Sequence, residues 1–150
     1  MLHRTLLVGA VIAIGCTTAV AQSEVLPSTA LMRTQSQHLY RTLNRMVRGE
    51  EPYDQAKVEA AFAGLAGTSA KIPSAFPESS QGKISAESNY QASPKVWETK
   101  ADFDARAAAL AKAIEDNRGK VTTLDGLKVA YPLVSGRCDA CHETYRLRKR

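Results

Sequence analysis

The pentapeptide Cys138-Asp139-Ala140-Cys141-His142, close to the end of the chain, constrains the fold more than any other feature. The chain has 150 residues and three cysteines, and two of these lie three positions apart with a histidine directly after. On a helix, positions i, i+3 and i+4 share one face, so these three side chains would point the same way. Three kinds of site use such a pattern: a redox-active cysteine pair, half of a zinc site, and a covalent haem attachment.

Two of these sites fit the rest of the sequence poorly. A thioredoxin-like pair belongs at a helix N-terminus near a βαβ unit, whereas this pair lies in the last predicted helix. A structural zinc site takes four ligands, usually as two pairs, and the sequence has no second C-x-x-C. A structural disulfide would close a loop too small to constrain the unfolded chain. The pattern therefore favours haem, with Cys138 and Cys141 as thioether tethers and His142 as the iron ligand.

The first 21 residues have the pattern of a secretory signal peptide. His3 and Arg4 are followed by an apolar run and then by an A-x-A motif that ends at Ala21, which is typical of a cleavage site. The apolar run is shorter than the about 20 residues needed to cross a bilayer about 30 Å thick. We therefore expect cleavage after Ala21 and export to the periplasm, with no transmembrane segment. A lipoprotein-type site that would leave a lipid on Cys16 is the weaker alternative.

The remaining residues, 22–150, are enough for one domain with a single core. The formal charge of the chain is +5, and the excess lies in the C-terminal tail, because acidic and basic residues balance over the rest of 22–150. A nucleic-acid-binding protein would instead spread basic residues along a face with interleaved aromatics. We therefore expect no nucleic-acid partner. The tail is interpreted as solvated, with a docking patch for an acidic partner as the alternative.

Apolar residues recur with helical spacing in four segments, which cover residues 28–48, 55–70, 93–117 and 124–149. Capping residues mark the boundaries: Gly49 follows the first segment, and Asp54 and Thr123 precede the second and the fourth. Pro132 is expected to kink the fourth helix locally. Residues 71–93 are predicted to form a long loop. Four amphipathic helices without an alternating strand pattern predict an all-α fold, an antiparallel four-helix bundle.

Small side chains are frequent in the predicted helices, and aromatic residues make up 6% of the chain. Alanines in a bundle interior leave room for a large flat group, although an alanine run also has high helix propensity. Beside a C-x-x-C-H motif we interpret these alanines as the lining of a pocket. The sequence therefore predicts a bundle that encloses one covalently attached haem c.

Four stretches carry a resemblance to a known family: CDACHETYR (138–146), RGEEPYD (48–54), SPKVWETKADF (93–103) and TLDGLKVAYPLVSGRC (123–138). In these stretches, and over essentially all of residues 22–150, the chain resembles the class II cytochromes c, the cytochrome c′ group. The C-terminal position of the C-x-x-C-H motif distinguishes this class from cytochromes with an N-terminal site. The resemblance implies a four-helix bundle, commonly a homodimer, with one covalent haem c and His142 as the proximal iron ligand.

The family divides at the sixth coordination position of the iron. Some members leave the iron five-coordinate and bind NO or CO, whereas low-spin members supply a methionine from the first helix. The apolar stripe of the first predicted helix runs through Met32, Ser36, Leu39, Leu43 and Met46. Met32 lies where low-spin members carry their ligand, and we predict it as the distal ligand, with plain packing as the alternative. Met46 is predicted to lie in the core.

Two departures from the family pattern affect the first helix. Members usually carry an arginine near a haem propionate about four residues before the distal position, and here that position is Ser28. Counting back from the turn at 52–54 also puts Met32 one residue out of register, with Arg33 in its place. His38 lies off the apolar stripe and is expected to be exposed.

Six residues are predicted to line the haem pocket. The aromatic ones, which would exclude water, are Trp97, Phe103, Tyr131 and Tyr145. The charged ones, either of which would pair with a propionate, are Arg137 and Arg146.

The function expected from these residues is single-electron transfer in the periplasm, with redox partner proteins, because Met–His ligation suits a haem that carries electrons. The alternative is a five-coordinate haem that binds NO or CO. We expect no enzymatic activity, since the sequence offers no convincing general acid or base. A peroxidase-like reaction would need such a group beside the iron, and only His38 is available for that role.

Overall fold

The first rod of the fold is built from three elements that follow one another without a break. In the computed structural model, which describes residues 25–149, these are α1 (Pro27–Ser36), the π-helical segment η1 (Gln37–Leu43) and α2 (Asn44–Val47). The backbone N–H of Asn44 donates to Leu39 O, five residues back. A π-helical turn holds one residue more than an α-helical turn, and no pattern in the sequence predicts it here. The predicted first helix is therefore present, but it is wider in its middle.

The second and third rods begin near the predicted residues. α3 (Gln55–Ser69) starts at Asp54, whose Oδ1 accepts a 3.1 Å hydrogen bond from the N–H of Lys57. The predicted third helix is divided into α4 (Lys95–Glu98) and α5 (Lys100–Arg118). The break falls at Thr99, which has φ −123° and ψ 47°, outside the helical region.

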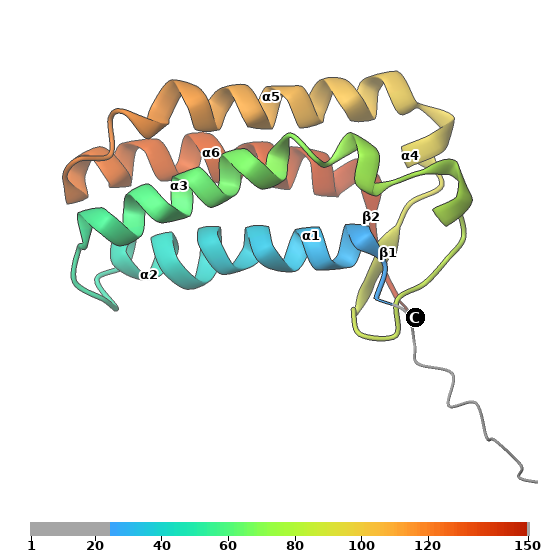
Figure 1. The fold of residues 1–150 in the computed structure, drawn as a ribbon, viewed down its shortest axis with the longest axis horizontal. Coiled ribbons are helices and arrows are strands. Elements are labelled where there is room, and N and C mark those ends of the chain that lie inside the picture. Colours follow the sequence, from blue (N-terminus) through green and yellow to red (C-terminus); the bar gives the residue numbers. More distant parts are fainter. Residues whose placement is uncertain (1–24, 150) are drawn as a thin grey trace, which may run out of the picture.

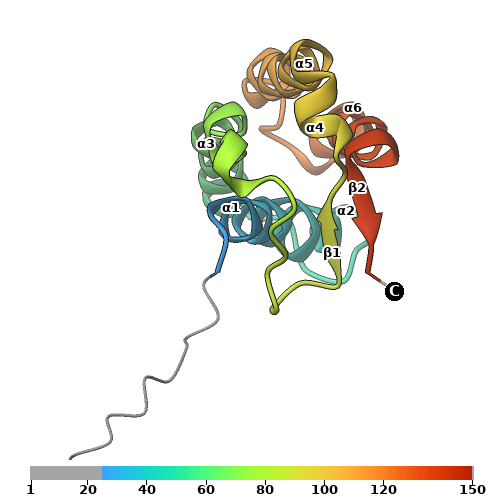
Figure 2. The ribbon, with the colours of Figure 1, turned by 90° about the vertical axis from the view of Figure 1, so that its right-hand side faces the viewer.

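The fourth rod, α6 (Leu124–Tyr145), carries the C-x-x-C-H motif near its end. Thr123 caps it, because its hydroxyl accepts a hydrogen bond from the N–H of Gly126 at 3.1 Å. The helix continues through Pro132 as a single element. Successive rods run in opposite directions, and viewed end-on α1, α3, α5 and α6 surround a common centre (Figure 1, Figure 2). The prediction of an antiparallel four-helix bundle is confirmed.

The C-terminal tail differs from the prediction. The fourth helix was expected to reach residue 149, but β2 (Arg146–Arg148) replaces its last turn and pairs antiparallel with β1 (Tyr90–Ala92). The predicted end of the fourth helix is therefore wrong, and a short two-stranded sheet takes its place within the all-α fold (Figure 2). The backbone of Arg146 is extended, with φ −118° and ψ 129°, because the tail finds hydrogen-bonding partners in the long loop. One of these bonds joins the N–H of Lys149 to Asn89 O at 2.9 Å.

The loop predicted at 71–93 contains short elements of its own, the 3₁₀ turns η2 (Pro73–Ala75) and η3 (Glu78–Ser80) as well as β1. It crosses from α3 to α4 at the end of the bundle where α1 begins and α6 ends (Figure 1). Lys149 fixes it there, since its Nζ donates to Ser85 O. The loop therefore closes the same end of the bundle at which the C-x-x-C-H motif lies.

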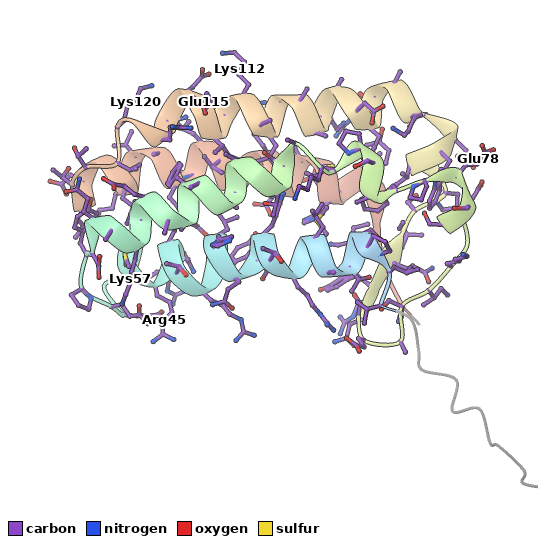
Figure 3. The ribbon with its side chains drawn as sticks, viewed as in Figure 1. Arg45, Lys57, Glu78, Lys112, Glu115 and Lys120 are labelled. Atoms are coloured by element: carbon purple, nitrogen blue, oxygen red, sulfur yellow. The ribbon has the colours of Figure 1, made fainter. Side chains whose placement is uncertain are left out.

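Apolar side chains from every rod meet along the bundle axis. The most completely buried large ones are Leu39, Leu43, Met46, Val58, Phe62, Leu65, Val96, Ile114, Val121, Leu127 and Val134. Met46 is 1% exposed, so its predicted place in the core is confirmed. Charged side chains such as those of Arg45 and Lys112 point away from the bundle (Figure 3). None of the helices in the described part of the chain is long and apolar enough to span a membrane.

Candidate functional site

The three side chains of the C-x-x-C-H motif open onto one cavity of about 570 Å³. Cys138 is 8% exposed, and Cys141 and His142 are half-buried. All three lie on one face of α6, as the spacing i, i+3 and i+4 requires. Cavities of roughly 300–1,000 Å³ are the usual size for cofactor sites. The motif is therefore placed in the wall of a cofactor-sized space.

Burial sets the protonation of these groups. It lowers the pKa of His142 to about 4, so the imidazole is neutral at pH 7 and has a free nitrogen lone pair for a metal ion. Burial raises the pKa of Cys138 to about 11, and it also raises the pKa of Cys141. A redox-active pair needs a lowered thiol pKa, which this site does not provide.

The alternative interpretations of the motif, a disulfide and a zinc site, gain no support from its surroundings. Cys138 and Cys141 are both free, not joined in a disulfide. Within residues 25–149, no group of three or more His, Cys, Asp or Glu side chains is arranged to hold a metal ion. A zinc site of four protein ligands is therefore not formed by the described residues.

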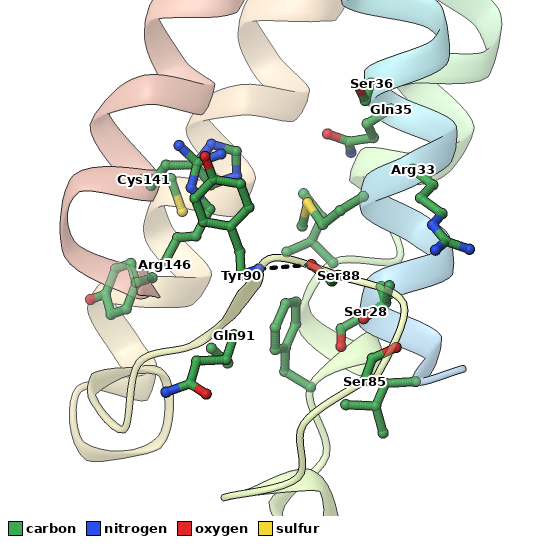
Figure 4. A pocket seen from close by; sticks show the side chains of 18 of the residues that line it. Ser28, Arg33, Gln35, Ser36, Ser85, Ser88, Tyr90, Gln91, Cys141 and Arg146 are labelled. Atoms are coloured by element: carbon green, nitrogen blue, oxygen red, sulfur yellow. Dashed lines mark hydrogen bonds between the residues drawn. The ribbon is translucent and has the colours of Figure 1, made fainter. Parts of the chain in front are cut away.

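Helix α1 forms the wall of the cavity that faces α6 (Figure 4). Met32, Gln35 and Leu39 line it, at intervals of three and four residues that keep them on one helical face. Arg33 lies at its rim, where its guanidinium donates to Glu87 Oε2 at 2.5 Å and to Glu87 O at 2.8 Å. The structure therefore brings Met32 and His142 to the same cavity from two different helices.

Three of the predicted aromatic residues line the cavity, namely Trp97, Phe103 and Tyr145. The rings of Phe103 and Tyr145 meet edge to face, with centroids 5.2 Å apart. Phe76, from the long loop, extends this cluster, its ring centroid 5.1 Å from that of Phe103. Sequence reasoning missed Phe76 because an irregular loop has no periodicity from which a buried face can be inferred. These rings give the cavity an apolar wall on the side of α5.

Two of the six predicted pocket residues do not line this cavity. Tyr131 lies on the correct stripe of α6 but two turns before Cys138, so it packs against the core further along the bundle. Arg137 directly precedes Cys138, is turned by about 100° from it, and is exposed. Arg146 does line the cavity, with its guanidinium 4.4 Å from the ring centroid of Tyr90.

His38 also lies away from the cavity. It is half-buried rather than exposed as expected, and its imidazole packs against α3 at Gly64, where a side chain of any size would collide with it. The cavity lining contains Ser36 from α1 and Leu39 and Tyr40 from η1, but not His38 itself. A distal acid–base role for this histidine has no geometric basis.

Two buried polar atoms in the cavity wall have no hydrogen-bond partner among residues 25–149: Gln35 Nε2 and Ser85 Oγ. Sequence reasoning missed both residues, although Gln35 could have been found because it lies one turn after Met32. Buried polar groups in native proteins nearly always have partners, so these two atoms are expected to bond to whatever fills the cavity. A group of this size with apolar faces and polar substituents fits the site, and a haem is such a group.

Comparison with known proteins agrees with this geometry. The family model described as Cytochrome C' matches residues 28–146. The chain belongs to the cytochrome c′ family. Cytochrome c-555 of Bradyrhizobium diazoefficiens is 39% identical over 98% of this chain and 99% of its own length.

Solved structures of this family share the fold. Oxidized cytochrome c556 of Rhodopseudomonas palustris is 35% identical and superposes with a TM-score of 0.72, over 82% of this chain and 95% of that one. A ferrous variant of cytochrome c prime from Alcaligenes xylosoxidans with bound NO is 27% identical, with a TM-score of 0.69 over 81% and 91%. The chain is thus a c-type haem cytochrome whose cofactor is a covalently attached haem c.

Proposed function

We propose that this cytochrome c′ family member carries single electrons, with haem tethered by Cys138 and Cys141 and its iron bound between His142 and Met32. The observation that supports this most directly is the arrangement of the axial candidates. His142 and Met32 line the same cavity from α6 and from α1, and these helices form facing walls (Figure 4). Within residues 25–149, neither side chain makes a hydrogen bond or an ion pair that would have to be broken.

In electron transfer the protein would hold the haem, shield it from water and tune its reduction potential. The haem, when bound, supplies an iron that takes up and releases one electron. A thioether and an imidazole as axial ligands favour the reduced state and so raise the reduction potential. The rings of Phe76, Phe103 and Tyr145 keep water from one side of the cavity, and a dry environment also affects the potential. Redox partner proteins in the periplasm would exchange the electron.

Covalent attachment is tested by intact mass and a pyridine haemochrome spectrum of the exported protein. The native chain should carry the mass of one haem and the spectrum of two thioether bonds. Cys138→Ala and Cys141→Ala should each leave one thioether, which shifts the pyridine spectrum toward that of a haem with one unreacted vinyl group. A native chain without covalent haem would refute the proposal as a whole.

The distal ligand is tested by visible spectra of the reduced protein with and without CO. The native protein should be low-spin and unchanged by CO, because Met32 occupies the sixth position. Met32→Leu removes the thioether at nearly constant volume, so the iron should become high-spin and bind CO readily. Met46→Leu is the matched control, since Met46 lies on the same rod but in the core and should leave the spectrum unchanged.

A five-coordinate haem that binds NO or CO is the second candidate. It is favoured by the similarity to the NO-bound cytochrome c prime structure and by the size of the cavity. The same spectra decide between the two functions. A native protein that is high-spin and binds CO at once supports the second candidate and removes Met32 as a ligand.

A further inference from the structure

Gln35 is a buried polar side chain in the wall of the cavity that α1 forms. It is 6% exposed, and its Nε2 has no hydrogen-bond partner within residues 25–149. Leaving a buried donor unpaired costs about 1–3 kcal/mol, and a hydrogen-bond partner inside the filled cavity would recover that cost. A leucine or methionine at this position would satisfy the helix and the cavity equally well.

The place of Gln35 indicates what its partner is. It follows Met32 by three residues and precedes Leu39 by four, so all three share the face of α1 that looks across the cavity at α6. Figure 4 shows its amide extended from α1 into the space between the two helices, toward the side from which Cys141 projects. A half-turn of the terminal amide exchanges its oxygen and its nitrogen, so the group can present an N–H to that space.

The other polar groups of this wall are less well placed to serve as donors. Arg33 is held at the rim by Glu87, with bonds of 2.5 and 2.8 Å. Ser36 is exposed, although it lies next to Gln35. Ser28 is buried and Thr29 is half-buried, and they lie four and three residues before Met32, so both are rivals on the same face.

We infer that the Gln35 amide is the hydrogen-bond donor for a diatomic ligand on the α1 side of the haem. The inference rests on the proposed haem attachment through Cys138, Cys141 and His142, but not on the identity of the sixth ligand. A donor at this point favours diatomic ligands that accept a hydrogen bond and slows their release. The α1 wall thus combines a thioether with a polar group that can donate to an exogenous ligand.

The experiment measures the C–O stretching frequency and the CO release rate of the reduced, haem-loaded protein. CO binding requires a free sixth position on the iron. If Met32 is the sixth ligand, the Gln35 variants are made in the Met32→Leu protein. If Met32 is not a ligand, they are made in the native protein, so Gln35 is tested in either case. A hydrogen bond to the ligand oxygen weakens the C–O bond. Gln35→Leu should therefore raise the stretching frequency and speed CO release about 2- to 10-fold, the usual worth of one hydrogen bond.

Two further variants make the result specific. Gln35→Met should behave as Gln35→Leu does, because it too removes the donor while keeping a long side chain. Ser28→Ala is the matched control on the other side of Met32 and should leave both quantities unchanged. Equal frequencies and rates with and without the Gln35 amide overturn the inference, as does a shift caused by Ser28→Ala alone. If the protein carries no covalent haem, the mass measurement shows this before any CO experiment, and that result refutes the proposed function as well as this inference.

Discussion

The hydroxyl of Tyr145 donates a 2.6 Å hydrogen bond to Asp102 Oδ2 and so joins the end of α6 to α5. Arg106 extends the connection, because its Nε donates to Asp102 Oδ2 at 2.8 Å and its Nη1 to Ala140 O at 2.7 Å. Ala140 lies between the two cysteines of the motif. The segment that is proposed to hold the haem is therefore tied to the neighbouring helix from two sides.

Replacing Tyr145 by phenylalanine should remove the hydroxyl and keep the ring that packs on Phe103. Asp102 and Thr99 would each lose a hydrogen bond, and we expect the free energy of unfolding to fall by about 1–2 kcal/mol. Urea unfolding at pH 7 measures this. Tyr90→Phe is the control, because Tyr90 is 43% exposed and should change the unfolding free energy by less than about 0.5 kcal/mol.

The same variant should alter the pH dependence of stability. The hydrogen bond from Tyr145, and then the one from Arg106, hold the pKa of Asp102 below its ordinary value. A carboxyl with a lowered pKa stabilises the fold above its unfolded pKa, and the stabilisation is lost as the pH falls through the folded value. The difference between native protein and Tyr145→Phe should therefore be largest near pH 7 and shrink below about pH 4. A difference that stays constant with pH would show that Asp102 is not involved.

A glycine is needed at position 64 because the side chain of His38 packs against it, and not because of the backbone conformation there. A Cβ at Gly64 would collide with the imidazole of His38, whereas a Cβ at Gly67 would have nothing within 4 Å. Alanine in a helix is favoured over glycine by about 1 kcal/mol, and Gly67→Ala should gain that amount. Gly64→Ala should gain less, because the imidazole must move.

A double-mutant cycle isolates the collision at Gly64. In a His38→Ala background the obstacle is absent, so Gly64→Ala should recover the full gain of about 1 kcal/mol. Thermal or urea unfolding of the four proteins gives the coupling energy. If Gly64→Ala stabilises the native chain as much as Gly67→Ala does, the proposed packing of His38 against α3 is wrong.

The features predicted correctly from the sequence are those set by neighbouring residues. Asp54 and Thr123 cap their helices because a cap needs only a side-chain oxygen two or three residues from a free N–H. The motif Cys138–His142 faces one cavity because helical spacing alone aligns its members. The bundle follows from four such local patterns.

The features predicted wrongly depend on distant parts of the chain. The tail at 146–148 leaves the helix because a strand more than 50 residues earlier offers it backbone hydrogen bonds, which periodicity cannot reveal. Tyr131 lies on the right stripe, but a stripe does not say how far along the axis the cavity extends. Ser36 was placed on the apolar stripe of the first helix, whereas the structure buries Gln35 and exposes Ser36.

The pairing of β2 with the long loop should protect that loop. A chain that ends at Tyr145 loses the strand ladder and the bonds from Lys149 to Asn89 O and Ser85 O. We expect faster trypsin cleavage after the exposed Lys83 and faster amide exchange at 90–92, both measured by mass spectrometry. Arg148→Ala keeps the backbone pairing and is the control. Equal cleavage in the truncated and native chains would show that the loop is held by other contacts.

The π-helical segment η1 explains why Met32 can face the cavity although it is offset by one residue from the family pattern. Counted back from the turn at 52–54, Met32 lies one residue out of the family register, yet it faces the cavity. One π-helical turn absorbs one additional residue, so the helical faces on both sides of η1 can keep their directions. A side-chain bond from the Thr42 hydroxyl to Gln37 O, five residues back, accompanies this turn.

Deleting a single residue within η1 should therefore be tolerated. Removing the exposed Arg41 returns the turn to α-helical geometry, and Met32 and Met46 should keep their places in the cavity and in the core. The visible spectrum of the loaded protein should stay as in the native protein. The control is deletion of the exposed Ala108 from α5, which is α-helical throughout and has no wide turn to absorb the change. That deletion rotates Phe103 by about 100° relative to the rest of α5 and should abolish folding. A deletion of Arg41 that is equally damaging would mean that η1 does not set the direction of Met32.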